Sequence, residues 1–252
     1  MPNDTIISAL FDPSNSEPSS KASTSAAENF VAKREPANGN FFTIRGADSA
    51  GQRSSANILL ARRYGWRGYQ TTALPETQLS SRITLTATDR NATIGTITVG
   101  LDDVGGLHAE NSFSQEVQAL RMAGRRVCEF TKLAVDTETA SKRVLASLFH
   151  VAYLLAYKLR NFNTLVIEVN PRHVSYYRRL LGCSVLGNER TNEAVQAPAV
   201  LLELDLDHTK SQIETFGGKP ELAKTERSLY PFAFSTVEEA GIVNRLRKEN
   251  WN

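Results

Sequence analysis

Two glutamates stand inside segments that are otherwise rich in β-branched and apolar residues. Glu129 lies in 127–135, VCEFTKLAV, and Glu168 lies in 164–170, TLVIEVN. A carboxylate in such a segment is either paired or functional, because an unpaired buried charge is costly. A functional carboxylate here could hold an amine or take its proton, directly or through water. The alternatives are an ion pair with an arginine from the front of the chain for Glu129, and a satisfied buried pair for Glu168.

The period of two along a strand assigns neighbours to both glutamates. Glu168 shares its face of 164–170 with Val166 and Asn170. In 127–135 one face holds Glu129, Thr131, Leu133 and Val135, and the other holds Cys128, Phe130, Lys132 and Ala134.

The composition excludes several classes of protein and site. With 29 basic and 27 acidic residues in 252, the charge of +2 is far below that of a dedicated nucleic-acid binder. No run approaches the ~18 apolar residues of a membrane span, and the N-terminus does not resemble a signal peptide. We therefore expect a cytoplasmic protein with no stable membrane insertion. Cys128, Cys183 and the four histidines show no ligand spacing, so we expect no metal.

The pattern of apolar residues predicts one α/β domain with a mixed sheet of about seven strands flanked by helices. Residues 1–38 are rich in Ser, Asn, Ala and Pro, which is typical of a disordered tail, and the domain then spans 39–208. The predicted strands are 41–45, 82–89, 92–102, 127–135, 164–170, 183–186 and 199–207.

Four helices are predicted between these strands, and one follows them. The first covers 49–69 and is expected to turn Ile58, Leu59, Ala61 and Arg62 inward, and the second is a short helix before Val127. The third covers 141–160 with one buried face, and the fourth covers 173–182 and ends at Gly182. The extension 209–252 is expected to dock a last helix, because Ser235 and Glu238 form a capping box before Val237, Ala240, Val243 and Leu246.

Five strings in this framework carry a resemblance to a known family. They are IRGADSAGQRSSANILLARRYGWRGY, CEFTKLAVD, EVNPRHVSYYRRLLGCSVLGNER, APAVLLELDLD and RSLYPF. Over residues 41–247 the chain resembles the long-chain N-acyl amino acid synthases, which are relatives of the autoinducer synthases. The element order is similar to that of the GNAT acyltransferase fold.

The resemblance implies transfer of a fatty acyl group from a thioester to the amine of an amino acid, with no bound cofactor. CoA-dependent GNAT proteins carry glycines before the long helix, where backbone N–H groups bind pyrophosphate. Residues 139–146 read TASKRVLA and hold no glycine, which favours acyl carrier protein over acyl-CoA as donor. Lys132 stands where autoinducer synthases carry Arg, which disfavours the first alternative, an acyl-homoserine lactone synthase. The other alternative is a non-catalytic module that binds acyl chains or carrier protein.

The resemblance also implies roles for single residues. Glu129, beside Thr131, would hold or deprotonate the amine, while Lys132, Glu168 and Asn170 would lie at the substrate. Tyr177, or Tyr176 if the register differs by one, would protonate the leaving thiol, although a tyrosine that only packs is the commoner case. A cover over the pocket would be formed by Arg62, Trp66 and Tyr69, which otherwise belong to an amphipathic helix. The acidic carrier protein would dock on Lys142, Arg143, Arg178 and Arg179, which otherwise form a solvated basic surface.

Overall fold

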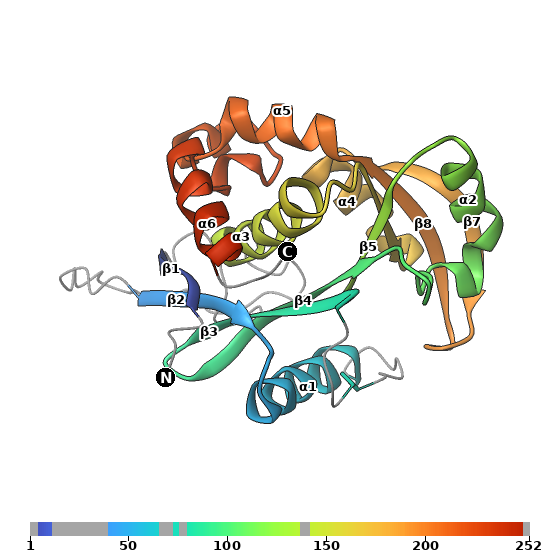
Figure 1. The fold of residues 1–252 in the computed structure, drawn as a ribbon, viewed down its shortest axis with the longest axis horizontal. Helices are drawn as coiled ribbons and strands as arrows, with labels where there is room; N and C mark the ends of the chain where they lie inside the picture. The colour runs from blue at the N-terminus through green and yellow to red at the C-terminus, as the bar shows by residue number, and fades with distance from the viewer. Residues whose placement is uncertain (1–4, 12–39, 66–72, 76–79, 137–141, 249–252) are drawn as a thin grey trace, which may run out of the picture.

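A single mixed sheet of eight strands forms the centre of the molecule (Figure 1). The computed structural model describes residues 5–11, 40–65, 73–75, 80–136 and 142–248. The strand order is β1-β2-β3-β4-β5-β6-β8-β7, and only the β5–β6 pair is parallel. The strands are β1 Thr5–Phe11, β2 Asn40–Gly46, β3 Arg82–Asp89, β4 Ala92–Leu101, β5 Val127–Val135, β6 Thr164–Val169, β7 Ser184–Asn192 and β8 Ala197–Asp205.

The mixed sheet flanked by helices confirms the predicted fold class. Seven strands correspond to the predicted ones, although β7 runs on to Asn192 and β8 ends at Asp205. The eighth strand, β1, pairs antiparallel with β2, so the predicted disorder is wrong for Thr5–Phe11. This short segment forms its strand with residues 29 to 40 positions away, a pairing that local composition does not reveal.

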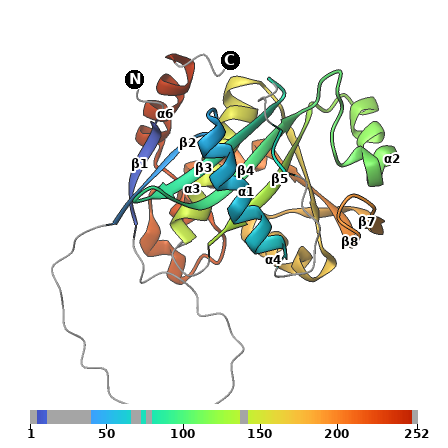
Figure 2. The ribbon, with the colours of Figure 1, turned by 90° about the horizontal axis from the view of Figure 1, so that it is seen from below.

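Helices cover both faces of the sheet (Figures 1 and 2). α1, Ala50–Gly65, and α2, Glu110–Met122, lie on the face that carries Glu129. The opposite face carries α3, Lys142–Tyr153, which continues as a π-helical segment, Leu154–Leu159. It also carries α4, Val174–Leu181, α5, Leu206–Phe216, and α6, Thr236–Lys248. Short 3₁₀ turns are formed by Pro171–His173, Pro220–Lys224 and Tyr230–Phe232.

The helix α5 is not among the predicted helices, and α3 differs from its prediction. Residues 206–207 were assigned to a strand, but α5 begins there because the Asp205 carboxylate accepts from the backbone N–H groups of Asp207 and His208 at 2.8 and 3.1 Å. α3 is buried on nearly its whole surface rather than on one face, since it packs against β3 and β4 of the sheet and also against the Tyr230–Phe232 turn.

The buried faces of the first and last helices are also partly different from those expected. On α1 the buried residues are Ala56, Leu59 and Leu60, whereas the predicted Ile58, Ala61 and Arg62 are exposed. The capping box of α6 is present, with the Ser235 N–H donating to Glu238 Oε2 at 2.8 Å. Its buried residues are Ile242, Val243 and Leu246, while the predicted Val237 and Ala240 are exposed.

Candidate active site

β5 and β6 pair only at their N-terminal ends. Their register runs from Val127 opposite Thr164 to Glu129 opposite Val166, and both strands continue beyond that point without pairing to each other. The strands therefore diverge from Phe130 and Ile167 onward. Backbone groups that lack a partner strand are available to a substrate, so this opening is a place for a polar chain to bind.

A β-bulge stands at the same place in β5. Thr98 of β4 lies opposite Thr131 and Thr96 lies opposite Ala134, so Lys132 and Leu133 together oppose one residue of β4. Lys132 has a φ of 50°, in the left-handed region. A bulge of this kind bends the strand and changes where its side chains point.

The bulge overturns the predicted alternation after Thr131. Ala134 packs with Leu59 and Leu60 of α1 on the face of Glu129, although it was assigned to the other face. Leu133 and Val135 pack against the main core on the opposite face. One extra residue inverts the period of two, and the sequence pattern contains no signal for that insertion.

Glu129 is buried and accepts three hydrogen bonds, and its side chain is only 2% exposed. Arg82 Nη1 donates to Oε1 at 2.6 Å, and the backbone N–H groups of His108 and Ala109 donate to Oε1 and Oε2 at 2.9 and 3.0 Å. Gly100 lies opposite, where a Cβ would stand 2.6 Å from Glu129 Cγ. The predicted ion pair with an arginine therefore exists, and Glu129 fastens the loop before α2 to the sheet.

Glu168 lies on the face of Glu129, two residues beyond Val166, where the strands have already diverged. Its Oε1 accepts from the Asn192 side-chain amide at 2.6 Å. Burial raises the pKa of Glu168, and the charge of Glu129 raises it further. The structure thus brings Glu129 and Glu168 to one side of the opening, as expected from their alternation.

Asn170 has a structural role at the end of β6. Its side-chain oxygen accepts from the Arg172 N–H at 3.3 Å, and its amide donates to the Pro198 carbonyl at 3.2 Å. These bonds cap the 3₁₀ turn that leads to α4. The Thr131 hydroxyl is buried and has no hydrogen-bond partner within the described part of the chain.

His108 is a candidate that sequence reasoning missed. Its side chain reaches solvent from the loop that Glu129 holds, and it interacts electrostatically with Glu129, Arg82 and Lys132. Partial burial lowers the pKa of His108 more than the Glu129 charge raises it, and Arg82 and Lys132 lower it further. Burial and Arg82 likewise lower the pKa of Lys132. His108 is therefore neutral near pH 7, with a ring nitrogen able to accept a proton.

The predicted tyrosine lies on α4. Tyr177 is half-buried against the main core, whereas Tyr176 is 36% exposed, and the two rings meet edge to face at 5.4 Å. The register therefore favours Tyr177 as the inward tyrosine.

The remaining predicted residues are distributed over the surface. Arg62 is largely exposed and pairs with Asp136, at the end of β5, at 2.8 Å. Trp66 and Tyr69 lie outside the described residues. Lys142 and Arg143 begin α3 and are half-buried, while Arg178 and Arg179 on α4 border a surface hollow beside Gly182 and Cys183.

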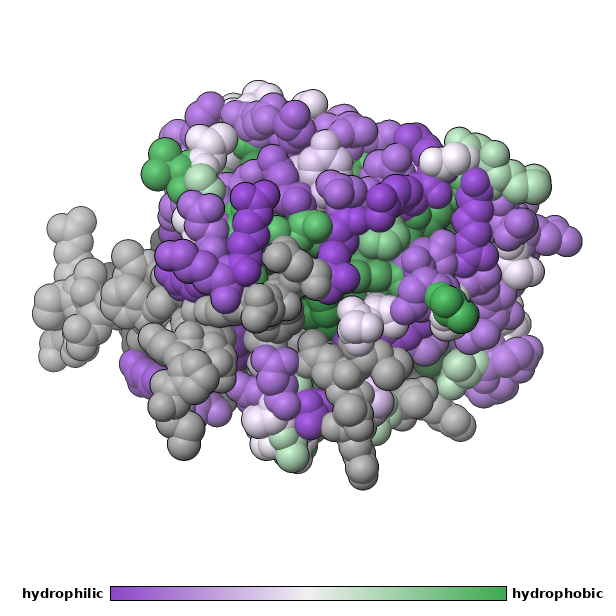
Figure 3. Space-filling view, in the orientation of Figure 1, coloured by the Kyte–Doolittle hydropathy of each residue, from purple (hydrophilic) through white to green (hydrophobic). Residues whose placement is uncertain are grey.

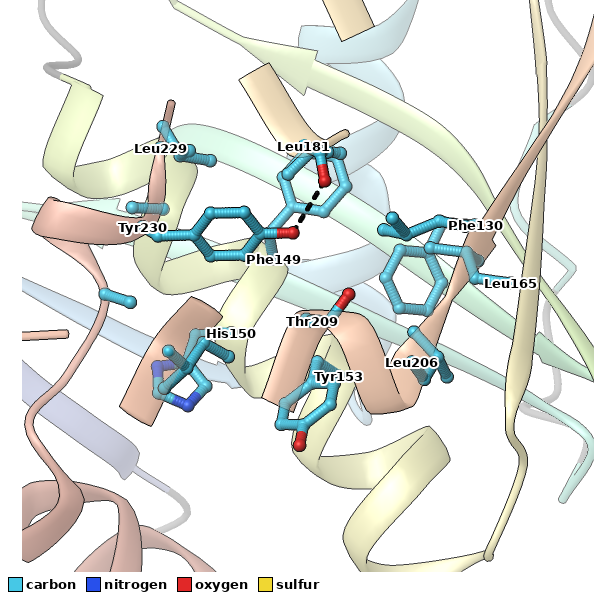
Figure 4. A pocket seen from close by; sticks show the side chains of 14 residues that line it. Phe130, Phe149, His150, Tyr153, Leu165, Leu181, Leu206, Thr209, Leu229 and Tyr230 are labelled. Carbon is cyan, nitrogen blue, oxygen red and sulfur yellow. Dashed lines mark hydrogen bonds between the residues drawn. The ribbon is translucent and has the colours of Figure 1, made fainter. Parts of the chain in front are cut away.

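A narrow apolar cavity lies on the opposite face of the sheet from Glu129 (Figure 4). Its lining includes Phe130, the first residue of β5 beyond the β5–β6 pairing, and Leu165 of β6. All of its lining side chains except His150 and Thr209 are apolar or aromatic. In Figure 3 apolar side chains also reach the surface near the centre of the molecule, with polar residues around them.

The described residues contain no cluster of three His, Cys, Asp or Glu side chains that could hold a metal ion. Burial raises the pKa of the Cys128 thiol well above its ordinary value and that of Cys183 to about 12. Both are protonated near pH 7 and poorly suited to act as nucleophiles. None of the described helices has the length and apolar character needed to span a membrane.

Comparisons with known proteins identify the family and the fold. A family model described as N-acyl amino acid synthase FeeM matches residues 55–205. The solved structure of FeeM, an N-acyl amino acid synthase from uncultured soil microbes, is similar with a TM-score of 0.61 and 24% identity, over 68% of this chain and 95% of that one. None of the curated proteins compared with the chain matches it.

Two further solved structures show weaker similarity. The AHL synthase LasI has a TM-score of 0.44 and 14% identity, over 67% of this chain and 91% of that one. An aminoglycoside N(6')acetyltransferase from Legionella pneumophila has a TM-score of 0.47 and 11% identity, over 68% and 95%. The family match spans more than half of the sequence, so the chain belongs to the N-acyl amino acid synthase FeeM family and is an acyltransferase of the GNAT fold.

Proposed function

We propose that this acyltransferase moves a long-chain fatty acyl group from an acyl carrier protein thioester to the amine of an amino acid. The opening between β5 and β6 carries this proposal, because its two sides differ in character. Charged groups gather on the face of Glu129, and an apolar cavity lined in part by Phe130 lies on the other face. A substrate pair with a charged acceptor and an apolar acyl chain fits such a division.

The reaction we propose is direct attack of the neutral amine on the thioester carbonyl. The new C–N bond forms, the C–S bond breaks, the amine gives up a proton and the leaving thiolate gains one. Backbone N–H groups where the strands diverge would stabilise the oxyanion. Tyr177 is our candidate donor to the thiolate. The raised thiol pKa values of Cys128 and Cys183 support a path without a covalent enzyme intermediate.

We propose that His108, rather than Glu129 directly, is the base that accepts the proton of the amine. Both oxygens of Glu129 already accept hydrogen bonds, whereas His108 is neutral and reaches solvent. Glu129 would act by fixing the loop that carries His108. Lys132 and Glu168, on either side of the divergence, would bind the charged groups of the amino acid.

The carrier protein would dock at the start of α3, where Lys142 and Arg143 are partly exposed. Acyl carrier proteins are acidic, so complementary charge would favour their encounter. The absence of glycine from residues 139–146 supports this donor, since a diphosphate requires close approach of backbone N–H groups.

Purified full-length protein should be given one acyl group on acyl carrier protein, on CoA and on a short pantetheine thiol, with a mixture of amino acids. Mass spectrometry of the organic phase should detect N-acyl amino acids, formed fastest from the carrier-protein thioester. The double variant Lys142→Glu with Arg143→Glu should lower kcat/KM for that donor about tenfold at low salt and leave the pantetheine thioester unaffected. Arg247→Glu with Lys248→Glu on the exposed part of α6 is the matched control.

Each of the opposite results would contradict a particular part of the proposal. Equal use of CoA, with no effect of the charge reversals, would exclude carrier-protein docking. A lactone formed only on addition of S-adenosylmethionine would indicate a homoserine lactone synthase. A folded protein that retains acyl groups without turnover would indicate a binding module.

A further inference from the structure

Part of the wall of the apolar cavity is formed by a segment of the chain that lies beyond the family match. Fourteen residues line the cavity (Figure 4). Six of them follow residue 205, where the match ends, and they belong to α5 and to the segment before α6: Leu206, Thr209, Ile213, Leu229, Tyr230 and Ala233.

Two of these residues, Leu229 and Tyr230, lie across the cavity from the diverging strands, whereas Leu206 lies beside Leu165 on the near side. In Figure 4, Phe130 and Leu165 lie on one side of the cavity, and Leu229, Tyr230 and His150 lie on the other. A chain that enters beside Phe130 would therefore reach Leu229 and Tyr230 at the far side of the cavity.

The far end of the cavity is held in place by hydrogen bonds to the body of the protein. The Tyr230 hydroxyl donates to the Leu181 carbonyl at 2.7 Å, and the Leu229 N–H donates to the Leu180 carbonyl at 2.9 Å. Because buried hydrogen bonds are strong, Leu229 and Tyr230 form a rigid part of the cavity wall that does not move freely to fit a bound molecule.

A buried histidine fastens the same segment from α3. His150 Nδ1 accepts from the Phe234 N–H at 3.0 Å, so the ring proton is on Nε2, which donates to Glu239 of α6 at 3.1 Å. Lys158 pairs with the other oxygen of Glu239 at 3.0 Å. Since Nδ1 must accept, His150 is neutral here, in agreement with the burial that lowers its pKa.

We propose that the C-terminal extension is the end stop of the acyl-chain site and sets the preferred acyl length, with Leu229 and Ala233 as the specificity-determining residues. This inference rests on the proposed acyl transfer. The proposed occupant of the cavity is the terminal methylene and methyl groups of the acyl chain, because the lining is apolar and includes Phe130 where the strands diverge. Each methylene that the end stop admits or rejects changes binding roughly fourfold.

The test measures relative kcat/KM for acyl carrier protein thioesters of increasing even chain length, in competition, on the full chain. Leu229→Ala should move the preferred length upward, and Ala233→Leu should move it downward. Leu85→Ala is the matched control, because Leu85 is a fully buried core leucine that does not line the cavity. Thermal melting identifies any variant that fails to fold, and the opposite directions of the two variants separate a changed end stop from general loosening.

A wild-type protein that forms no N-acyl product would overturn the proposed function itself. Turnover by the wild type, with the same length preference in both folded variants, would overturn only the assignment of the end stop. A shift in Leu85→Ala equal to that in Leu229→Ala would also contradict it.

Discussion

The two faces of the sheet at the β5–β6 opening are built by opposite means. On the face of α1 and α2, Glu129 brings together Arg82 and two backbone N–H groups, and polar side chains reach solvent. On the face of α3 and α5, apolar side chains line a cavity, and a buried hydrogen bond from Tyr230 fixes part of the C-terminal extension in its wall. The difference shows that one backbone divergence can separate a charged reactant from an apolar one, because each face supplies its own dielectric environment.

The largest effect is expected on stability when Glu129, the carboxylate that holds the polar face together, is removed. Glu129→Ala leaves Arg82, whose side chain is 17% exposed, and two N–H groups without their acceptor. Removal of one partner of a buried ion pair costs about 3–5 kcal/mol of unfolding free energy. Urea denaturation should measure this loss, with Glu214→Ala in the exposed Lys210–Glu214 pair as the control. A loss below about 1 kcal/mol would show that Glu129 does not hold the loop together.

The next largest effect concerns catalysis on the same face. His108→Gln should lower kcat/KM about a hundredfold at neutral pH, which is typical of a lost general base. Since the His108 pKa lies below its ordinary value, the wild-type rate should fall only under acidic conditions, where the ring becomes protonated and cannot accept.

The pH profile distinguishes this role from a structural one. In His108→Gln the rate should rise with pH until the free amine loses its own proton, and the deficit should shrink there. His208→Gln, on α5, is the control. An unchanged profile in His108→Gln, or the same change in His208→Gln, would exclude His108 as the base and return the role to Glu129.

The smallest effect tests the electrostatics between the two glutamates. Glu168→Gln keeps an oxygen that can accept from Asn192 but removes a charge that burial and Glu129 disfavour. The raised folded-state pKa means that ionisation of Glu168 destabilises the fold as pH rises through that value. We therefore expect Glu168→Gln to gain up to about 1 kcal/mol at neutral pH and nothing once the pH is low enough to protonate the wild-type carboxyl. Urea denaturation of both proteins at the two pH values measures this difference in unfolding free energy. A gain that is larger at low pH than at neutral pH would contradict the raised pKa of Glu168.

Much of the framework follows from local pattern. Seven strands, the helices between them, the αL termination at Gly182 and the Ser235 capping box were all predictable, since each depends on residues a few positions apart. Glu129 and Glu168 were also found in this way, because a charged residue inside an apolar strand stands out against its neighbours.

Other features depend on contacts between distant segments. β1 exists through pairing with β2, and α5 starts where a strand was expected. His108 carries no signal in its neighbouring residues and becomes a candidate only because its loop is held against Glu129.

The sequence by itself determined most of the element types, the family resemblance and the identity of the two carboxylates, because periodicity and local propensity are properties of neighbouring residues. Only the tertiary structure decided which partners Glu129 has, where the bulge at Lys132 inverts the strand, and which distant segment forms part of the wall of the apolar cavity. Those outcomes depend on packing and hydrogen bonds between residues far apart in the chain. Many tertiary arrangements are compatible with the same local pattern, and the native one leaves the fewest buried polar groups without a hydrogen-bond partner.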